Sequence, residues 1–494
     1  MIFSSPRFFV FMVLLLVALR LVRSLEGRLS LLLFASCLFY AAWDWRYLGL
    51  LLLVSGINWV CGARIAAARD ARVRHAWVVT SVVASLAILG WFKYANFFAG
   101  NLNTALAVLG SGVRVPLPEM LLPAGISFYV FKTMSYTIDI HRRGLAPARS
   151  PMNYATFTTF FPELIAGPIV RASVFLPQMG RDIGPSAERL RTGASLFLIG
   201  LTKKVLIADP LAGIADPIFG APQHYSGLSL WMGLAAYTVQ IYCDFSGYSD
   251  MAIGCAKMIG YDLPRNFRMP YASGDVAEFW RRWHITLSTW LRDYLYIPLG
   301  GNRHGAARTY ANLAITMLLG GLWHGASWNF VAWGGLHGAA LALHRAVRGA
   351  LGERFRTPRP LAIAVTLLFV MLCWVPFRSP DFATTREILR RLFTLDAAGA
   401  HFVPVLLFPC LALVALGHAI GSAIDAAVER GPDGVHALAW LRPLAADVVK
   451  DPISGWIVRL GVGTLPGMVL VGSWLLAIVF FAATGASPFI YFQF

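Results

Sequence analysis

Long apolar runs separated by short polar stretches make up most of the chain. Many of these runs approach the roughly 20 residues that a helix needs to cross a bilayer. The candidate spans are 8–22, 29–43, 48–66, 76–92, 121–140, 190–208, 228–245, 313–343, 361–377, 402–420 and 465–483. Because a helix satisfies its own backbone in lipid, the pattern predicts an all-α polytopic membrane protein. We find no internal repeat, so one membrane-embedded domain is expected to cover residues 1–494.

Composition supports this interpretation. The chain has 494 residues, of which 57% are hydrophobic and only 14% are charged, and its mean hydropathy is +0.62. A soluble protein of this length is far less apolar. The net charge of +17 comes from Arg residues between the apolar runs and not from one basic domain. We therefore expect membrane lipid around the protein and no nucleic-acid partner.

The charges of the first loops alternate. Basic loops at 20–28, 64–74 and 141–149 are separated by the poorly charged loops 44–46 and 95–120. Because basic loops stay in the cytoplasm, this pattern places the N-terminus on the opposite, periplasmic side. The six cysteines are scattered and form no CxxC pair, so neither a zinc site nor a disulfide framework is predicted.

Two polar features interrupt the apolar pattern in the first half of the chain. Residues 156–170, TFTTFFPELIAGPIV, contain Pro162, Gly167 and Glu163, which favours a re-entrant or discontinuous helix buried in protein. Gln240 and Asp244 are four residues apart and share one predicted helix face. They are either turn and cap residues or a polar substrate-binding cluster at membrane depth.

Residues 275–338 contain two histidines in unusual settings. His284 lies in DVAEFWRRWHITLSTWLRDYLYIPLGGNRHG, and His324 lies in a segment that otherwise reads as membrane-spanning. Burying an ionisable group at membrane depth costs free energy, and such groups tend to be functional. Helical spacing around His284 predicts a face that lines a polar cavity. That face consists of Trp280, Arg281, His284, Ser288 and Leu291.

The sequence is similar to the membrane-bound O-acyltransferase family, in particular its bacterial alginate O-acetyltransferase-type branch. The similarity rests on RRWHITLSTWLRDYLYIPLGGNR and LLGGLWHGASWNFVAWGGLHG. It extends through LPAGISFYVFKTMSYTIDIHR, FFPELIAGPIVR, QIYCDFSGYSDMAIG and the terminal SPFIYFQF. These blocks occur in order over residues 122–494.

The resemblance implies a fold, a site and partners. The fold would be a ring of tilted transmembrane helices with re-entrant segments around a central conduit, in the bacterial inner membrane. His324 would be the essential membrane-embedded histidine, and His284 the second family histidine on the cytoplasmic side. Acetyl-CoA would donate the acetyl group in the cytoplasm, with no bound cofactor and no metal. Periplasmic acetyltransferase partner proteins of a polysaccharide acetylation complex would receive it.

The chemistry of the residues agrees with acyl transfer to a hydroxyl. An imidazole supplies a base near neutral pH, and His284, Asn329 or a nearby Trp N–H would donate to the developing oxyanion. Helical spacing predicts that Ser327 and Trp328 share the face of His324. Direct transfer is favoured, with Ser327 as a nucleophile left as an alternative.

Arg281 and Arg282 have two interpretations. They are either interfacial anchors or contacts for the phosphates of the donor.

The sequence gives less support to two other functions. A polysaccharide transporter would often show a two-fold internal repeat, and a lipid-phosphate glycosyltransferase would need more acidic residues than Asp44 near a first span. Within O-acetylation the polymer is expected to be alginate, with cellulose or peptidoglycan as alternatives.

Overall fold

The computed structural model describes residues 1–118, 121–180, 184–352, 357–430, 445–449, 457–460, 472–478, 480 and 489. Nearly all of this part of the chain is helical, which confirms the predicted helical membrane protein. The residues form two compact units, one made of Met1–Gly193 with Cys255–Leu263 and the other of Ala194–Gly254 with Pro264–Phe494. The predicted span 465–483 lies mostly outside the described residues.

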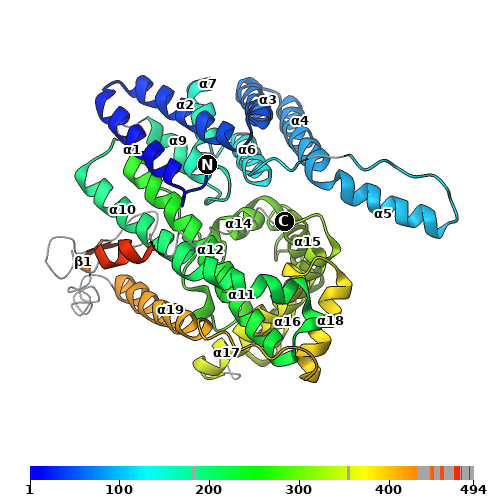
Figure 1. Cartoon of the computed structure of the whole chain (residues 1–494). Coiled ribbons are helices and arrows are strands. Elements are labelled where there is room, and N and C mark those ends of the chain that lie inside the picture. Colours follow the sequence, from blue (N-terminus) through cyan, green and yellow to red (C-terminus); the bar gives the residue numbers. More distant parts are fainter. Residues whose placement is uncertain are drawn as a thin grey trace. The chain divides into compact units, whose positions relative to one another are not determined.

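The first unit is a set of helices, most of them joined by short connections, with a longer one between α5 and α6 (Figure 1). They are α1 (Pro6–Leu21), α2 (Leu25–Asp44), α3 (Leu48–Ala67), α4 (Ala71–Leu89), α5 (Ala95–Val108), α6 (Ile126–His141), α7 (Pro151–Thr159), α8 (Phe161–Leu164) and α9 (Ala172–Met179). Side-chain caps start several of them: Ser5, Ser24, Asp70 and Ser150 each accept a hydrogen bond from a first-turn backbone N–H, as N-caps usually do.

Polar side chains connect α3, α4 and α6 inside the first unit. The hydroxyl of Ser81 lies 2.6 Å from Oδ1 of Asn58 and 2.7 Å from the hydroxyl of Thr137. All three residues are buried. Small and hydrogen-bonding side chains of this kind hold membrane helices together, because lipid gives apolar side chains little reason to associate.

The predicted break in residues 156–170 is present. Helix α7 ends at Thr159 and α8 begins at Phe161. At the break, Lys132 of α6 forms a buried ion pair with Glu163 and also donates to the carbonyl of Phe157. This charge is therefore paired and hydrogen-bonded, as a buried charge must be.

One loop prediction was wrong. Residues 95–120 were expected to be a long loop, but α5 occupies Ala95–Val108 and continues α4 through the π-helical turn Gly90–Tyr94. No proline interrupts the segment, and its Ala and Leu residues favour helix over loop.

Four helical stretches within the described residues are long and apolar enough to cross a bilayer. They are Leu25–Ala67, Ala71–Val108, Arg359–Arg378 and Leu407–Glu429. They support the assignment of the chain as a multi-pass membrane protein. The other predicted spans that the structure describes form helices that do not meet the same length and hydropathy.

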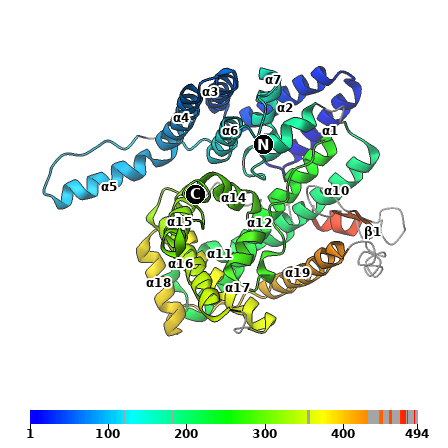
Figure 2. The ribbon, with the colours of Figure 1, turned by 180° about the vertical axis from the view of Figure 1, so that it is seen from behind.

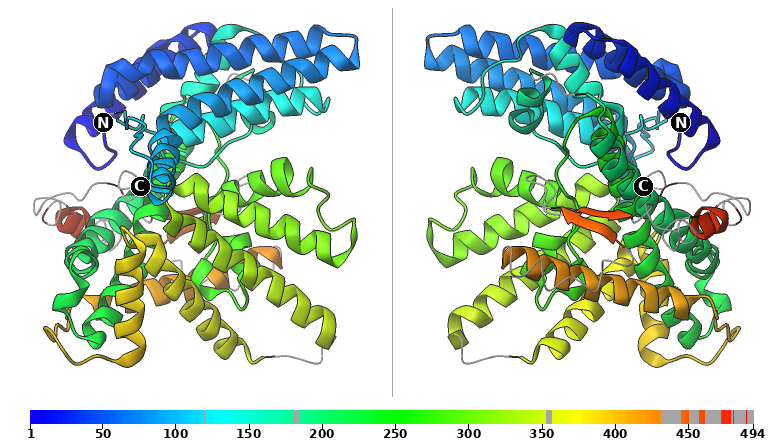
Figure 3. Two further views of the ribbon diagram at one scale, coloured as in Figure 1. Left: turned by 90° about the vertical axis from the view of Figure 1, so that its right-hand side faces the viewer. Right: turned by 90° about the vertical axis from the view of Figure 1, so that its left-hand side faces the viewer.

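The second unit contains the histidine stretch. Its main helices are α11 (Asp209–Gly220), α12 (Gly227–Ile259, whose last turn belongs to the first unit), α13 (Val276–Arg282), α14 (Ile285–Leu291), α15 (Gly305–His324), α16 (Trp328–Leu351), α17 (Arg359–Arg378), α18 (Phe382–Thr394) and α19 (Leu407–Glu429). Helix α10 (Ala187–Thr202) leads into it from the first unit. A short antiparallel pair, β1 (Ala445–Val449) and β2 (Ile457–Leu460), is also present (Figure 3).

Helices α15 and α16 pack closely side by side (Figure 2). A Cβ atom at Gly321 would collide with the backbone carbonyl of Phe330, and one at Gly334 would collide with that of Met317. Glycine is needed at both positions because the two backbones approach each other there. The hairpin fixes the position of His324, the last residue of α15.

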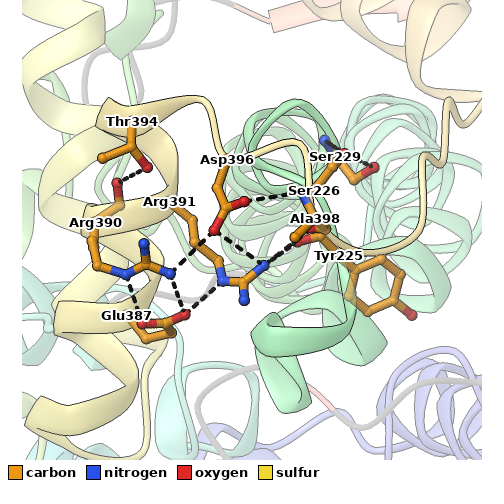
Figure 4. Close-up of polar contacts among 9 residues, drawn as sticks. All are labelled: Tyr225, Ser226, Ser229, Glu387, Arg390, Arg391, Thr394, Asp396 and Ala398. Atoms are coloured by element: carbon orange, nitrogen blue, oxygen red, sulfur yellow. Dashed lines mark hydrogen bonds and ion pairs between the residues drawn. The ribbon is translucent and has the colours of Figure 1, made fainter.

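Amphipathic helix α18 is docked by its charges and its backbone (Figure 4). Glu387 accepts hydrogen bonds from Arg390 and Arg391. Arg391 also donates to the carbonyl of Tyr225 at 3.1 Å, and the indole of Trp231 donates to the carbonyl of Leu392 at 3.1 Å. The contacts of Tyr225 and Trp231 join α18 to the start of α12, whereas those of Glu387 lie within α18.

Candidate functional site

The backbone around His284 is not one helix. Helix α13 ends at Arg282, Trp283 is extended, and His284 adopts the left-handed conformation with φ 42° and ψ 53° before α14 begins. Backbone hydrogen bonds to a neighbouring segment replace those of a helix. The amide of Ile285 donates to the carbonyl of Asn266 at 2.9 Å, and the amide of Arg268 donates to that of Arg282 at 2.9 Å.

The predicted helical face around His284 was therefore wrong. Trp280 and Arg281 belong to α13, whereas Ser288 and Leu291 belong to α14, and the chain changes direction between them. Helical periodicity does not carry across a left-handed residue. The break instead turns the imidazole of His284 into the protein, where the residue is 0% exposed.

His324 ends α15 and is 5% exposed. Its ring packs edge-to-face against Trp333 and Phe377, with centroid distances of 5.1 Å and 5.3 Å. His284 is packed in the same manner against Phe245, at 4.7 Å. The two imidazoles lie next to each other, with ring centroids 6.3 Å apart. The structure thus brings together the two histidines that the sequence singled out.

The predicted shared face of His324, Ser327 and Trp328 was wrong. Gly325 is extended, and Ser327 caps a new helix by accepting a hydrogen bond from the amide of Asn329 at 3.1 Å. Trp328 is 53% exposed. The sequence 313–343 is therefore two helices, because Gly325 and the capping serine end one and start the next.

Asn329 lies in the first turn of α16 and is 2% exposed. Its side-chain amide donates to the carbonyl of Ser379 at 2.8 Å. Its Oδ1 finds no hydrogen-bond partner within the described part of the chain. In this conformation Asn329 offers an acceptor, and one of its two amide N–H groups binds Ser379, so its expected role as an oxyanion donor stays a prediction.

A different donor lies beside His324. Trp333 is 1% exposed, and its indole N–H has no hydrogen-bond acceptor among the residues that the structure describes. Buried indole N–H groups usually find a partner. Trp333 therefore provides an available donor next to one of the two imidazoles.

Gln240 and Asp244 are both buried on α12, as the four-residue spacing indicated. Asp244 lies 2.8 Å from Nζ of Lys204, which also pairs with Asp209 at 2.8 Å. A buried carboxylate needs such a partner. The ion pair with Lys204 explains how the carboxylate of Asp244 can be buried.

The two arginines before His284 differ. Arg281 is exposed, whereas Arg282 forms an ion pair with Glu278 at 2.8 Å. Arg359 of α17 pairs with the same carboxylate at 2.9 Å. Arg282 thus stabilises α13, whereas the guanidinium group of Arg281 is exposed.

The sequence did not single out Asn266, Phe245 or Phe377 as neighbours of the two histidines. These residues come from the loop before α13, from α12 and from α17. No local spacing could connect them, because the contacts join segments far apart in the chain.

The second unit also contains a cavity of about 530 Å³, and neither histidine lines it. Its walls are mainly apolar residues of α12, α17 and α19. The histidine pair is therefore a separate feature from this cavity.

Two neighbouring buried imidazoles inside a polytopic helical protein fit acid–base chemistry at membrane depth. The family model described as MBOAT, membrane-bound O-acyltransferase family, matches residues 37–376. The chain belongs to the membrane-bound O-acyltransferase family and is an O-acetyltransferase.

Its relatives act on different polymers, as their names state. The chain is 44% identical to the probable alginate O-acetylase AlgI of Azotobacter vinelandii, over 80% of this chain and 78% of that protein. It is 42% identical to the probable alginate O-acetylase AlgI of Pseudomonas aeruginosa, over 80% and 75%. It is also 37% identical to the peptidoglycan O-acetyltransferase of Helicobacter pylori, over 74% and 73%.

Proposed function

We propose that this protein lies in the bacterial inner membrane and passes acetyl groups across it for the O-acetylation of an exopolysaccharide, namely alginate. The observation that carries the mechanism is the buried pair of His284 and His324, 6.3 Å apart at their ring centroids. The choice of alginate rests on the two AlgI relatives at 42–44% identity.

The reaction is a direct transfer from acetyl-CoA. The hydroxyl oxygen of the acceptor attacks the acetyl carbonyl, an ester C–O bond forms and the thioester C–S bond breaks. His324 accepts the hydroxyl proton and returns it to the leaving thiolate, so the products are the acetyl ester and free CoA. The indole N–H of Trp333 donates to the oxygen on which negative charge develops.

The aromatic residues around the pair have a role in this mechanism. Trp333 and Phe377 exclude water from His324, which strengthens each electrostatic contact with the reacting atoms. Ser327 is not needed as a nucleophile, because its hydroxyl caps α16.

The direction of transfer follows from the charges of the loops. The Arg-rich region 265–308 lies in the cytoplasm in this proposal, together with residues 64–74 and 141–149, and the N-terminus is periplasmic. Arg side chains bind phosphate groups in a forked geometry, and exposed Arg281 is the candidate contact for the donor. Periplasmic acetyltransferase partner proteins then receive the acetyl group.

A thiol-labelling experiment tests the direction. Arg69, Arg143 and Arg303 are all exposed, and each is changed to cysteine in a background without the six native cysteines. A membrane-impermeant maleimide is added to intact spheroplasts and to inverted vesicles. We expect labelling in inverted vesicles only, and labelling of Arg303→Cys in intact spheroplasts would overturn the proposed direction.

A second polymer is favoured by one specific finding, the peptidoglycan O-acetyltransferase of Helicobacter pylori at 37% identity. To separate the two functions, the chain is expressed in a strain that lacks its alginate O-acetylase and in a strain that lacks its peptidoglycan O-acetyltransferase. Acetate bound to uronic acid and acetate bound to muramic acid are then measured. Restoration of the muramic ester alone would replace alginate by peptidoglycan as the polymer.

A further inference from the structure

The side-chain amide of Asn266 is buried next to the imidazole of His284. Asn266 is 1% exposed, and its Oδ1 lies 3.1 Å from Nδ1 of His284. The same oxygen accepts hydrogen bonds from the backbone N–H of Thr286 at 3.3 Å and from the Thr286 hydroxyl at 2.9 Å. On its other side the amide nitrogen of Asn266 donates to the hydroxyl of Ser249 at 3.2 Å.

These contacts fix the orientation of the amide. A backbone N–H can only donate, so the atom that faces Thr286 must be the carbonyl oxygen. The hydroxyl of Ser249 accepts from the amide nitrogen at the opposite end. The oxygen and nitrogen of Asn266 are thus assigned by their partners, as such assignments must be.

The oriented amide in turn fixes the tautomer of His284. A carbonyl oxygen has no hydrogen to give, so Nδ1 of His284 must carry the proton in this hydrogen bond. A neutral imidazole carries only one N–H, and its lone pair is then on Nε2. The left-handed backbone of His284 and the bond from Ile285 to the carbonyl of Asn266 hold the ring at this distance.

We propose that Asn266 is a positioning residue that holds His284 in the Nδ1–H tautomer, so that Nε2 acts as a hydrogen-bond acceptor in acetyl transfer while His324 remains the base. The role of Nε2 in acetyl transfer rests on the proposed function, whereas the tautomer of His284 does not. The proposal changes one expectation from the sequence: a neutral His284 in this tautomer has no N–H at Nε2 with which to stabilise an oxyanion.

The arrangement also accommodates the protonated form of His284. The imidazolium keeps its Nδ1–H bond to Asn266, and a hydrogen bond from a charged donor is stronger than one from a neutral donor. A third group that orients a catalytic histidine in this way recurs in unrelated hydrolases. Here the third group is a neutral amide.

The first test measures the tautomer itself and needs no activity. Purified protein with ¹⁵N-labelled histidine is compared with His284→Gln, which identifies the His284 signals. We expect the wild-type ring to show a protonated Nδ1 and an unprotonated Nε2. An Nε2–H tautomer in the wild-type protein would overturn the proposal, whether or not the protein acetylates alginate.

The second test uses Asn266→Asp, which keeps an acceptor beside Nδ1, and Asn266→Leu, which removes it. We expect Asn266→Leu to lower the acetylation rate by roughly ten- to a hundredfold, in line with other groups that orient a histidine. Asn266→Asp should retain the wild-type tautomer and most of the rate. Equal losses in both variants with the tautomer unchanged would contradict a positioning role.

A double-mutant cycle separates positioning from folding. Asn312 is also fully buried, and its amide donates to the carbonyl of Gly301 at 2.9 Å, so Asn312→Leu is the control for loss of a buried amide. If Asn266 acts through His284, Asn266→Leu causes no further loss of rate in a His284→Ala background. A further tenfold loss in that background would show that Asn266 acts by another route.

Discussion

The imidazole of His284 lies 6.3 Å from that of His324 between ring centroids, with the two planes inclined at 61°. The residues are 40 positions apart in the sequence and come from two helix ends, the start of α14 and the end of α15. Two histidines that the sequence marked separately therefore lie side by side, as the proposed reaction centre requires.

Replacing His284 by alanine is predicted to slow acetylation without removing the protein from the membrane. A positioned acid–base group typically contributes about a hundredfold to ten-thousandfold in rate. The measurement is the initial rate of acetyl transfer by purified protein in liposomes, with membrane content checked by immunoblot. A variant that fails to accumulate would show instead that His284 supports the fold.

Replacing Trp333 by phenylalanine tests the oxyanion donor. The variant keeps an aromatic ring against His324 but removes the indole N–H, whose loss is expected to lower kcat by about a hundredfold to a thousandfold with little change in KM. Exposed Trp328→Phe, in the same helix, is the matched control and should be near wild type. A normal kcat for Trp333→Phe would remove this residue from the mechanism.

Gly334→Ala is predicted to destabilise the α15–α16 hairpin. The added methyl group would collide with the backbone carbonyl of Met317, whereas at neighbouring Gly335 it would meet only a side-chain atom of Leu318 at 3.5 Å. Overpacking of this kind costs about 1–3 kcal/mol. Thermal unfolding in detergent should therefore show a lower midpoint for Gly334→Ala than for Gly335→Ala, and equal midpoints would refute the close approach.

Helix α18 is predicted to lose stability in acid. Hydrogen bonds from Arg390 and Arg391 lower the pKa of Glu387 to about 2, from about 4.3 for an unperturbed glutamate. Because the folded pKa is the lower one, the stabilisation is complete above about pH 4.3 and is lost as the pH falls toward 2.

The comparison of wild type with Glu387→Gln isolates this effect. The wild type should unfold at a higher temperature than the variant at pH 7, and the difference should shrink between pH 4.3 and pH 2. A difference that stays constant over this range would show that the ionisation of Glu387 does not hold α18.

The sequence predicted the helical membrane class and the break between α7 and α8, and it singled out two histidines that the structure places side by side. It failed where tertiary contacts override helical periodicity. At His284 the backbone forms hydrogen bonds with residues 266–268, and after Gly325 a new helix is capped by Ser327. The helix faces that were predicted to continue through these two positions were therefore wrong. Asn266 and Phe377 were missed because they reach the site from distant segments and have no local pattern.

The proposed role of His324 as the base for acetyl transfer is tested by acetate per uronic acid in polymer from cells that carry His324→Ala. Exposed His401→Ala is the control, and membrane content is matched between strains. We predict that His324→Ala reduces bound acetate to the level of the deletion strain, while His401→Ala stays at the wild-type level. Wild-type acetate with His324→Ala would show that His324 is not the base.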